Sequence, residues 1–310
     1  MTLTELRYVV AVARERHFGR AAEACFVSQP TLSVAVKKLE EELGVALFER
    51  RANDVAVTAQ GERIIEQAQR VLEEVESLRQ LAAAGQDPLA APLRLGAIYT
   101  IGPYLLPYLI PALRKRAPKM PLRVEENFTA VLTERLRQGE LDAIIISLPF
   151  EEPGILTLPL YDEPFVVALP ADHPWTGRKS IKAADLPQES LLLLGSGHCF
   201  RDQVLKVCPA LNRSSAGGMQ KTLEGSSLET IRHMVASGAG ITVLPCSSVA
   251  TTAGPERRLL ATRPFASPAP SRRVALAWRK SFPRPQAIEA LRQALLDSRL
   301  ECVAPVRAGR

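Results

Sequence analysis

Short apolar runs alternate with amphipathic stretches from Pro92 to the C-terminal end, and this alternation limits the folds open to the chain more than any other feature. Strands are predicted at LRLGAI (93–98), LRVEENF (122–128) and LDAIIISL (141–148), then at FVVALP (165–170), LLLL (191–194), GITVLP (240–245) and RRVALAW (272–278). Helical stretches separate most of them, and a last helix is expected from about Pro285 to Leu296. Such alternation indicates α/β units around largely parallel sheets.

The first 58 residues have a different pattern. Residues 1–17 and 18–26 repeat apolar positions at helical spacing, and a third helix begins after Ser28, an N-cap residue, with Pro30 in its first turn. Helix, helix, short turn and helix is the order of a helix-turn-helix. The following segment, 45–58, has β-rich ends and a polar Asn53-Asp54 tip, which predicts a small hairpin or wing.

A long helix without proline is predicted from Ala59 to about Ala84. Apolar residues recur along it at alternating steps of four and three: Ile64, Ala68, Val71, Val75, Leu78 and Ala82. That spacing is typical of a coiled-coil seam, although an amphipathic helix packed on its own domain is the alternative. Gly85, Asp87 and Pro88 then mark a hinge.

The positive charge is not where a nucleic-acid surface would need it. The chain has a formal net charge of +6 and a pI of about 9.2. Residues 1–58 nevertheless hold eight Lys and Arg against eight Asp and Glu, whereas residues 253–310 hold twelve against four. A prediction of DNA binding therefore depends on residue pattern at the N-terminal end and not on bulk charge.

That pattern is present at the start of the third helix, whose N-terminal residues would reach base edges in a helix-turn-helix. We predict a DNA-binding set with short polar side chains at the helix start, a lysine for phosphates and an arginine on the wing: Ser28, Gln29, Pro30, Thr31, Ser33, Lys37 and Arg50. A surface helix with a polar cap would show similar spacing.

One cysteine is surrounded by groups that make a thiol reactive. In GSGHCFRDQVLKVC (195–208), His198 precedes Cys199 and Arg201 follows it, and FRDQVLKV predicts a helix that starts beside the cysteine. Cationic neighbours and a helix N-terminus both favour the thiolate. Cys208 would lie roughly 13 Å away along a continuous helix, whereas a disulfide needs Cα atoms within about 4.4 to 6.8 Å. Bonding of this pair therefore requires the helix to unwind.

The other three cysteines, Cys25, Cys246 and Cys302, have no such neighbours and are interpreted as inert buried residues. Neither a signal peptide nor an apolar run of membrane-helix length is recognisable, so a cytoplasmic location is expected. There a disulfide is more often transient and redox-sensing than structural. Zinc is disfavoured because His198, Cys199 and Cys208 lack the paired spacing of a structural site, and no metal or cofactor is expected.

The quoted residues also carry a resemblance. FGRAAEACFVSQPTLSVAVKKLEEELGVALFER (18–50) resembles the winged helix-turn-helix of LysR-type transcriptional regulators, and SLETIRHMVASGAGITVLP (227–245) resembles part of that family's effector region. GHCFRDQ (197–203), with a further cysteine nine residues after Cys199, resembles the hydrogen peroxide-sensing branch of the family. The resemblance covers essentially the whole chain.

The fold that this resemblance implies is an N-terminal all-α winged helix-turn-helix with a linker helix, followed by an α/β regulatory domain. That regulatory domain would consist of two Rossmann-like subdomains similar to periplasmic binding proteins. The expected divisions are a DNA-binding domain at 1–58, a dimerisation helix at 59–85, a hinge at 86–91 and the regulatory domain at 92–310. Subdomain I would comprise about 92–163 and 268–310, and subdomain II about 164–267.

The resemblance also implies roles for individual residues. Cys199 would react with peroxide to give a sulfenic acid, and Cys208 would resolve it as a disulfide. The peroxide-positioning set comprises Thr100, Thr129, His198, Asp202 and Arg272. Arg273, next to Arg272, is the alternative for the arginine.

The implied function is transcriptional activation of oxidative-stress defence genes by hydrogen peroxide, without enzymatic turnover. The implied partners are double-stranded DNA, peroxide, further copies of the chain in a dimer and tetramer, and RNA polymerase, with no membrane. Two alternatives stay open: a LysR-type regulator that responds to a metabolite, and a thiol peroxidase.

Overall fold

The computed structural model describes residues 1–51, 54–84, 87–209, 223–250, 258–298 and 300–306. Its contacts divide the chain into two units, 1–85 with 137–139, and 86–136 with 140–310. Each unit is described by itself.

The smaller unit contains the helices and hairpin expected at the N-terminal end. Its elements are α1 (Leu3–Glu15), α2 (Phe18–Ala24), α3 (Gln29–Leu43), β1 (Phe48–Arg51), β2 (Asp54–Val57) and α4 (Ala59–Ala84). Ser28 caps α3 by accepting a hydrogen bond from the Thr31 backbone N–H at 3.3 Å, and Gly44 ends the helix in the left-handed region at φ 67°. Apolar side chains of α1, α2, α3 and the hairpin form one core.

The apolar row on α4 changes in burial along its length. Ala68 is buried in the core of the small unit and Ile64 packs against that core. Farther along, Leu78 is 66% exposed and Val71 is 36% exposed. The interpretation of a helix packed on its own domain therefore holds for the first turns of α4, and the coiled-coil seam stays a prediction.

The larger unit is built on a curled sheet, with strands in the order β4-β3-β5-β11-β6-β9-β7-β8 and with β10 and β12 also paired to β6. Its first part comprises β3 (Leu93–Ile98), α5 (Gly102–Arg116), β4 (Leu122–Asn127), α6 (Thr129–Arg137), β5 (Ala143–Ser147) and β6 (Ile155–Pro170). The middle comprises the 3-10 turns η1 (Pro174–Gly177) and η2 (Ala183–Gln188), β7 (Leu191–Leu194), α7 (Cys199–Val207), β8 (Leu223–Gly225), α9 (Leu228–Ala236) and β9 (Ile241–Pro245). It ends with α10 (Ser247–Ala250), β10 (Leu260–Pro264), β11 (Ser271–Arg279), α11 (Pro285–Asp297) and β12 (Ala304–Pro305).

The sheet is less parallel than the sequence predicts. Parallel pairing joins β3 to β4 and β5, and β7 to β8 and β9. However, β6 is a single 16-residue strand, far longer than the predicted 165–170, and it pairs antiparallel with β11, β9, β10 and β12. Most of its first half is exposed or half-buried, so it lacks the continuous apolar run by which the other strands are recognised.

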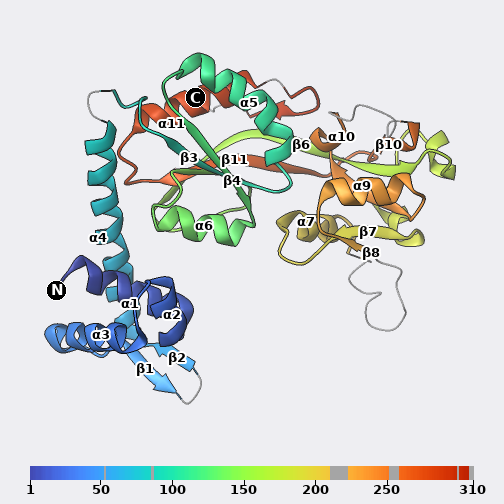
Figure 1. Cartoon of the computed structure of the whole chain (residues 1–310). Coiled ribbons are helices and arrows are strands. Elements are labelled where there is room, and N and C mark those ends of the chain that lie inside the picture. Colours follow the sequence, from blue (N-terminus) through green and yellow to red (C-terminus); the bar gives the residue numbers. More distant parts are fainter. Residues whose placement is uncertain (52–53, 85–86, 210–222, 251–257, 299, 307–310) are drawn as a thin grey trace. The chain divides into compact units, whose positions relative to one another are not determined.

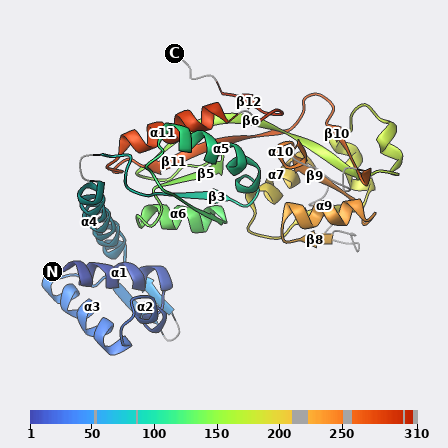
Figure 2. The ribbon, with the colours of Figure 1, turned by 45° about the horizontal axis from the view of Figure 1, so that its top comes forward.

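Strand β6 runs between two hydrophobic cores. One core gathers β3, β5, β11, α5 and α11, and the other gathers the second half of β6 with β7, β9, α7 and α9. In the first part, α5 and α11 lie side by side over one face of the sheet and α6 covers the other (Figure 1 and Figure 2). This arrangement brings the carboxyl ends of β3 and β4 toward the second core.

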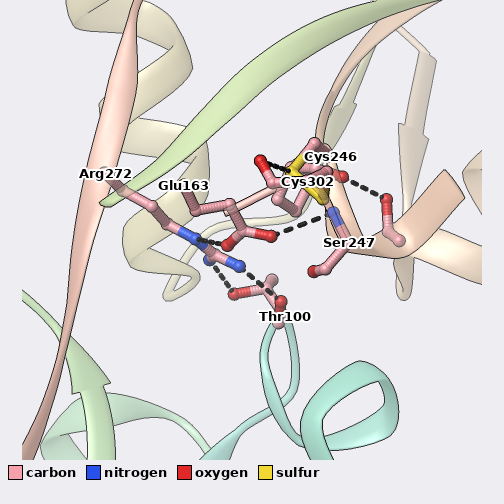
Figure 3. The surroundings of a disulfide bond; sticks show 8 residues. Thr100, Glu163, Cys246, Ser247, Arg272 and Cys302 are labelled. Atoms are coloured by element: carbon pink, nitrogen blue, oxygen red, sulfur yellow. Dashed lines mark hydrogen bonds and ion pairs between the residues drawn. A yellow bond between two sulfur atoms is a disulfide. The ribbon is translucent and has the colours of Figure 1, made fainter. Parts of the chain in front are cut away.

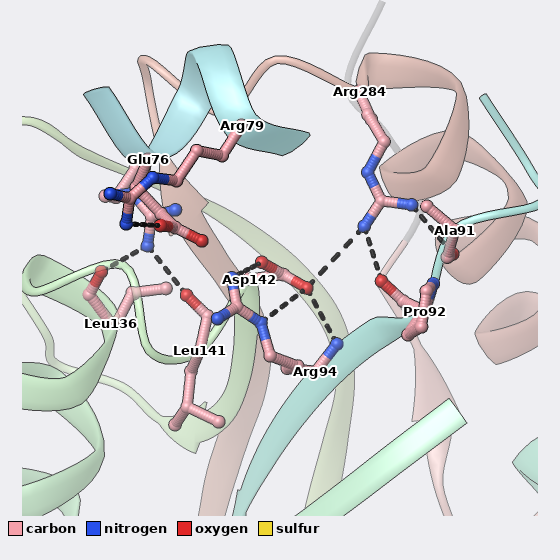
Figure 4. A network of polar contacts seen from close by, with 10 residues as sticks. Glu76, Arg79, Ala91, Pro92, Arg94, Leu136, Leu141, Asp142 and Arg284 are labelled. Atoms are coloured by element: carbon pink, nitrogen blue, oxygen red, sulfur yellow. Dashed lines mark hydrogen bonds and ion pairs between the residues drawn. The ribbon is translucent and has the colours of Figure 1, made fainter. Parts of the chain in front are cut away.

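A buried ion network anchors the start of the larger unit (Figure 4). Arg284 is 2% exposed and donates to the backbone oxygens of Ala91 and Pro92 at 2.9 and 2.7 Å. Asp142 lies 3.6 Å from Arg284 and receives two donors from Arg94 at 2.7 Å. Of the cationic residues in 253–310, Arg272, Arg279 and Arg284 are buried inside the fold.

Among the described residues, no helix combines the length and the apolar character needed to cross a membrane.

Candidate functional sites

A small pocket forms where three loops meet at the carboxyl ends of β3, β4 and β7. Its volume is about 10 Å³, and it is lined by Ile98, Tyr99, Thr100, Asn127, Phe128, Thr129, Gly197, His198 and Cys199. Loops after parallel strands are where ligands bind in open α/β sheets. Four of the residues predicted to handle peroxide, namely Thr100, Thr129, His198 and Cys199, are brought together here although up to 99 positions separate them.

Cys199 is the first residue of α7 and is half-buried. Its sulfur therefore lies at the positive end of a nine-residue helix, where negative charge is stabilised. Gly197 precedes it at φ 93°, a conformation that favours glycine, and a Cβ there would lie 3.4 Å from the Phe128 ring. The turn into α7 thus holds the cysteine at the pocket.

Cys208 is at the other end of the same helix. It is the C-cap of α7, is 3% exposed, and its backbone N–H donates to the Val204 carbonyl at 3.2 Å. Cys199 and Cys208 are both reduced. The predicted helix between the two sulfurs is confirmed, and with it the expectation that they do not meet while the helix is intact.

His198 acts on the pocket as a neutral group. Its ring packs edge-on against Phe128 at 4.8 Å and Tyr99 at 5.9 Å between ring centroids. Burial lowers the pKa of the imidazole from its ordinary value of 6.5, against a hydrogen bond to the Ser226 backbone that raises it. The imidazole is therefore uncharged at neutral pH and offers hydrogen bonding, not a positive charge.

The two threonine hydroxyls of the pocket differ in their partners. Thr100 Oγ1 accepts a hydrogen bond from Arg272 at 2.8 Å, and this leaves its own proton for another acceptor. Thr129 Oγ1 is buried and makes no hydrogen bond to any residue in the described part of the chain. Because a buried hydroxyl without a partner is costly, Thr129 is suited to bind a small polar molecule in the pocket.

Arg272 supports the pocket from behind. Its guanidinium donates to Thr100 Oγ1, to the Thr100 carbonyl at 2.7 Å and to Glu163 at 2.7 Å (Figure 3). The Arg272 and Glu163 side chains are both fully buried. Arg273 is instead exposed and pairs with Asp162 at 2.7 Å. Of the two adjacent arginines, the geometry therefore favours Arg272.

Two charged neighbours of Cys199 do not point into the pocket. Arg201 donates to the Leu194 carbonyl at 2.6 Å and pairs with Glu224 at 2.7 Å, so its charge is already balanced. Asp202 is exposed in the first turn of α7 and is not among the pocket residues. The sequence argument that Arg201 acts on the thiolate is thus not supported by these contacts.

The interpretation of Cys246 and Cys302 as inert residues is wrong. The two form a disulfide with a Cα–Cα distance of 6.0 Å (Figure 3). They are 56 positions apart, and nothing in their local sequence marks them as partners. Cys25 is half-buried in the small unit with a reduced thiol, and burial raises its pKa, as expected for an inert cysteine.

Sequence reasoning also missed Tyr99, Phe128 and Glu163. Tyr99 and Phe128 each directly precede a threonine that was predicted to lie in the pocket, and this adjacency could have identified them from the sequence. Glu163 gave none, because its pairing with Arg272 depends on the β6–β11 register.

The start of α3 forms a second candidate site, a nucleic-acid surface. Ser28, Gln29, Pro30 and Thr31 are exposed there, and the Ser28 and Thr31 hydroxyls are hydrogen-bonded to each other at 2.8 Å. Ser33 is half-buried, and Lys37 is exposed and lies 3.6 Å from Glu41.

On the wing, Arg50 belongs to β1 and is paired with Val55, but its side chain lies outside the described residues. Phe26 is 95% exposed and Val34 is 68% exposed beside the polar residues of α3. The sequence reasoning missed both, because it looked only for polar groups.

No group of three or more His, Cys, Asp or Glu side chains suited to a metal ion occurs in the described ranges.

Comparisons with known proteins match both ends of the chain. Residues 3–62 match the family model "Bacterial regulatory helix-turn-helix protein, lysR family", and residues 86–299 match "LysR substrate binding domain". The "DNA-binding transcriptional dual regulator OxyR" of Escherichia coli K12 is 41% identical over 298 residues, 95% of each chain.

Two solved structures extend the likeness to the fold. Full-length OxyR from Pseudomonas aeruginosa, a cysteine-to-aspartate variant, is 56% identical over 100% of this chain and 99% of its own, with a TM-score of 0.72. A cysteine-to-serine variant of Corynebacterium glutamicum OxyR was solved with H2O2 bound. It is 35% identical over 96% of this chain and 92% of its own, with a TM-score of 0.62. The chain therefore belongs to the LysR family of bacterial helix-turn-helix regulators, in its OxyR group.

Proposed function

We propose that this protein is a transcriptional regulator that hydrogen peroxide activates through Cys199 and Cys208. The observation that carries the proposal is the pocket itself, in which a thiol at a helix N-terminus meets two hydroxyls and a neutral imidazole. Hydrogen peroxide is a small uncharged molecule whose two oxygens both need hydrogen-bond partners. Thr100, Thr129 and His198 could align its O–O bond for attack by the Cys199 thiolate. Asp202, which is exposed, would contribute from outside the pocket or after the helix moves.

The chemistry has two steps. The Cys199 thiolate attacks one peroxide oxygen, the O–O bond breaks, and the departing hydroxide takes a proton to become water. The Cys208 thiolate then attacks the Cys199 sulfur of the sulfenic acid, so that an S–S bond forms, the S–O bond breaks and a second water leaves. Two thiols are oxidised and one peroxide is reduced.

The second step requires α7 to unwind. The 13 Å estimated for an intact helix exceeds the 4.4 to 6.8 Å that a disulfide spans. Unwinding withdraws Phe200 and Val204, each 2% exposed, from the second core. At about 1.5 to 3 kcal/mol for each apolar side chain, this costs roughly 3 to 6 kcal/mol, which disulfide formation must offset. Oxidation would thereby convert a local bond into a change of packing.

The pocket proposal is tested by mapping thiols by mass spectrometry before and after brief exposure to peroxide. We expect a Cys199–Cys208 bond in the wild type and a persistent sulfenic acid in Cys208→Ser. Cys199→Ser should retain DNA binding and lose its peroxide response, whereas the control Cys25→Ser should keep both. An intact peroxide response in Cys199→Ser would overturn the proposal, and a metabolite-responsive regulator would instead keep its response to its effector in that variant. Sustained multi-turnover consumption of peroxide with a reductant would favour a thiol peroxidase.

We further propose that α3 enters the DNA major groove and that the exposed part of α4 joins two copies of the chain. We also propose that the protein forms a tetramer, contacts RNA polymerase and acts in the cytoplasm, where the DNA lies. Gln29→Ala and Thr31→Ala should weaken binding to an operator selected from random DNA more than binding to random DNA itself. Lys37→Ala should weaken both about equally. Equal losses for all three variants would refute base readout by α3.

A further inference from the structure

The Cys246–Cys302 pair is built differently from the Cys199–Cys208 pair. Its Cα–Cα distance of 6.0 Å lies within the range of a disulfide, so this bond, unlike one between Cys199 and Cys208, needs no helix to unwind. Cys246 Sγ also lies 3.1 Å from the Cys302 carbonyl oxygen, an acceptor for the thiol when the pair is reduced.

The two sulfurs differ in access to solvent. Cys246 is 4% exposed at the junction of β9 and α10, whereas Cys302 is half-buried in the segment between α11 and β12. Thiol–disulfide exchange requires one sulfur that an external thiol or disulfide can reach. Cys302 is that sulfur, and Cys246 is the partner that resolves the mixed disulfide.

The bond holds the C-terminal segment against β6. Strand β12 has only two residues, Ala304 and Pro305, which pair with Asp162 and Tyr161. So short a strand contributes little pairing of its own. The disulfide, two residues before it, is the covalent tie that keeps this segment beside Glu163.

A continuous buried chain leads from the disulfide to the peroxide pocket (Figure 3). Ser247, next to Cys246, donates its backbone N–H to one Glu163 oxygen at 3.0 Å. The other Glu163 oxygen accepts from Arg272 at 2.7 Å, and Arg272 holds the hydroxyl and carbonyl of Thr100. The Arg272 guanidinium also lies 5.3 Å from the centre of the Phe200 ring, on α7. The side chains that form its hydrogen bonds, those of Glu163, Arg272 and Thr100, are each 2% exposed or less.

We infer that Cys246 and Cys302 form a second redox-modification site, which exchanges with low-molecular-weight disulfides and sets the reactivity of Cys199 toward peroxide. The Cys302 thiolate attacks the small disulfide and releases one thiol. Cys246 then attacks the mixed disulfide, forms the Cys246–Cys302 bond and releases the second thiol. Two protein thiols are oxidised and one small disulfide is reduced to two thiols. The bond fixes Ser247 and Glu163, and through Arg272 it keeps Thr100 in its peroxide-binding position.

The exchange is tested in a Cys199→Ser/Cys208→Ser variant of the full chain, so that it is independent of the proposed function. The protein is equilibrated in buffers of reduced and oxidised glutathione, its thiols are trapped by alkylation, and the Cys246 and Cys302 peptides are quantified. We expect reversible oxidation, with the same midpoint as in the wild type. A pair that stays reduced at every ratio, or one that stays bonded until the protein unfolds, would overturn the inference.

The effect of the Cys246–Cys302 bond on Cys199 rests on the proposed reaction of Cys199 with peroxide. It is tested by the rate at which Cys199 forms a sulfenic acid with peroxide. Cys302→Ser should slow that rate about threefold or more, the scale on which contacting residues couple, whereas Cys25→Ser should leave it unchanged. Wild-type protein in which Cys246 and Cys302 are reduced along with Cys199 and Cys208 should show the same slowing relative to protein that keeps the Cys246–Cys302 bond, which covers the case that Cys302→Ser folds poorly. Equal rates in all samples would refute the coupling. If wild-type Cys199 does not react at all, both the proposed function and the coupling fail, while the glutathione titration still decides the second pair.

Discussion

The chain contains two adjacent arginine–carboxylate pairs that differ in burial, and Glu163→Gln tests what burial contributes. Glu163 faces Arg272, and Asp162 faces Arg273, directly across β6 and β11. Successive residues of a strand point to opposite faces. The first pair is therefore fully buried, whereas the side chains of the second are 37% and 48% exposed.

Glu163→Gln removes the negative charge that compensates the buried Arg272 guanidinium. It also replaces one carboxylate oxygen, which accepts a hydrogen bond from Arg272 or Ser247, with an amide NH₂ group that can only donate. Leaving one member of a buried ion pair without its partner typically costs 3 to 5 kcal/mol. Asp162→Asn is the matched control, and an exposed pair should contribute about 1 kcal/mol or less. The charge change is the same in both variants, so the difference reports burial.

The measurement is denaturant unfolding of the full chain followed by tryptophan fluorescence. Both tryptophans, Trp175 and Trp278, belong to the larger unit, so the signal reports on that unit. We expect the free energy of unfolding to fall by about 3 to 5 kcal/mol in Glu163→Gln and by about 1 kcal/mol or less in Asp162→Asn. Equal losses in the two variants, or a more stable Glu163→Gln protein, would refute the reasoning.

Three further predictions concern other parts of the chain. Ser28→Ala should lower the stability of the small unit by about 1 kcal/mol in thermal unfolding, whereas an unchanged melting curve would show that the α3 cap contributes nothing. Because burial lowers the pKa of His198, the unfolded state binds a proton at this imidazole more readily than the folded state, so stability should fall as the pH drops below 6.5. The variant His198→Gln should show a smaller fall. An NMR titration that gives an ordinary imidazole pKa for His198 would contradict this explanation. Leu78→Asp, on the exposed part of α4, should weaken self-association in sedimentation experiments, while the control Glu74→Asp should not; an unchanged association constant would argue against α4 as the joining surface.

The elements of the DNA-binding end were open to prediction because their signals are local. Ser28 caps α3 through Thr31, three residues away, and Gly44 ends that helix with its own backbone conformation. The start of α7 at Cys199 and the strands β3, β5 and β9 were also predictable, since periodicity and apolar runs extend over only a few residues.

Family resemblance supplied more of the peroxide pocket than residue chemistry did. Cys199 and His198 stand out by their neighbours in the sequence, but Thr100 and Thr129 would otherwise be read as helix caps. Asp202 and Arg201, equally close to Cys199 in sequence, face away from the pocket because α7 turns them to other sides.

The sequence by itself determined the order of helices and strands, the caps that bound them and the helix that keeps Cys199 apart from Cys208, because each depends on contacts among near neighbours. Tertiary structure alone decided that β6 runs between both cores, that Glu163 meets Arg272 across 109 positions and that Cys246 bonds to Cys302 across 56. Those pairings follow from strand register and from where the C-terminal segment packs. No local pattern encodes either of them.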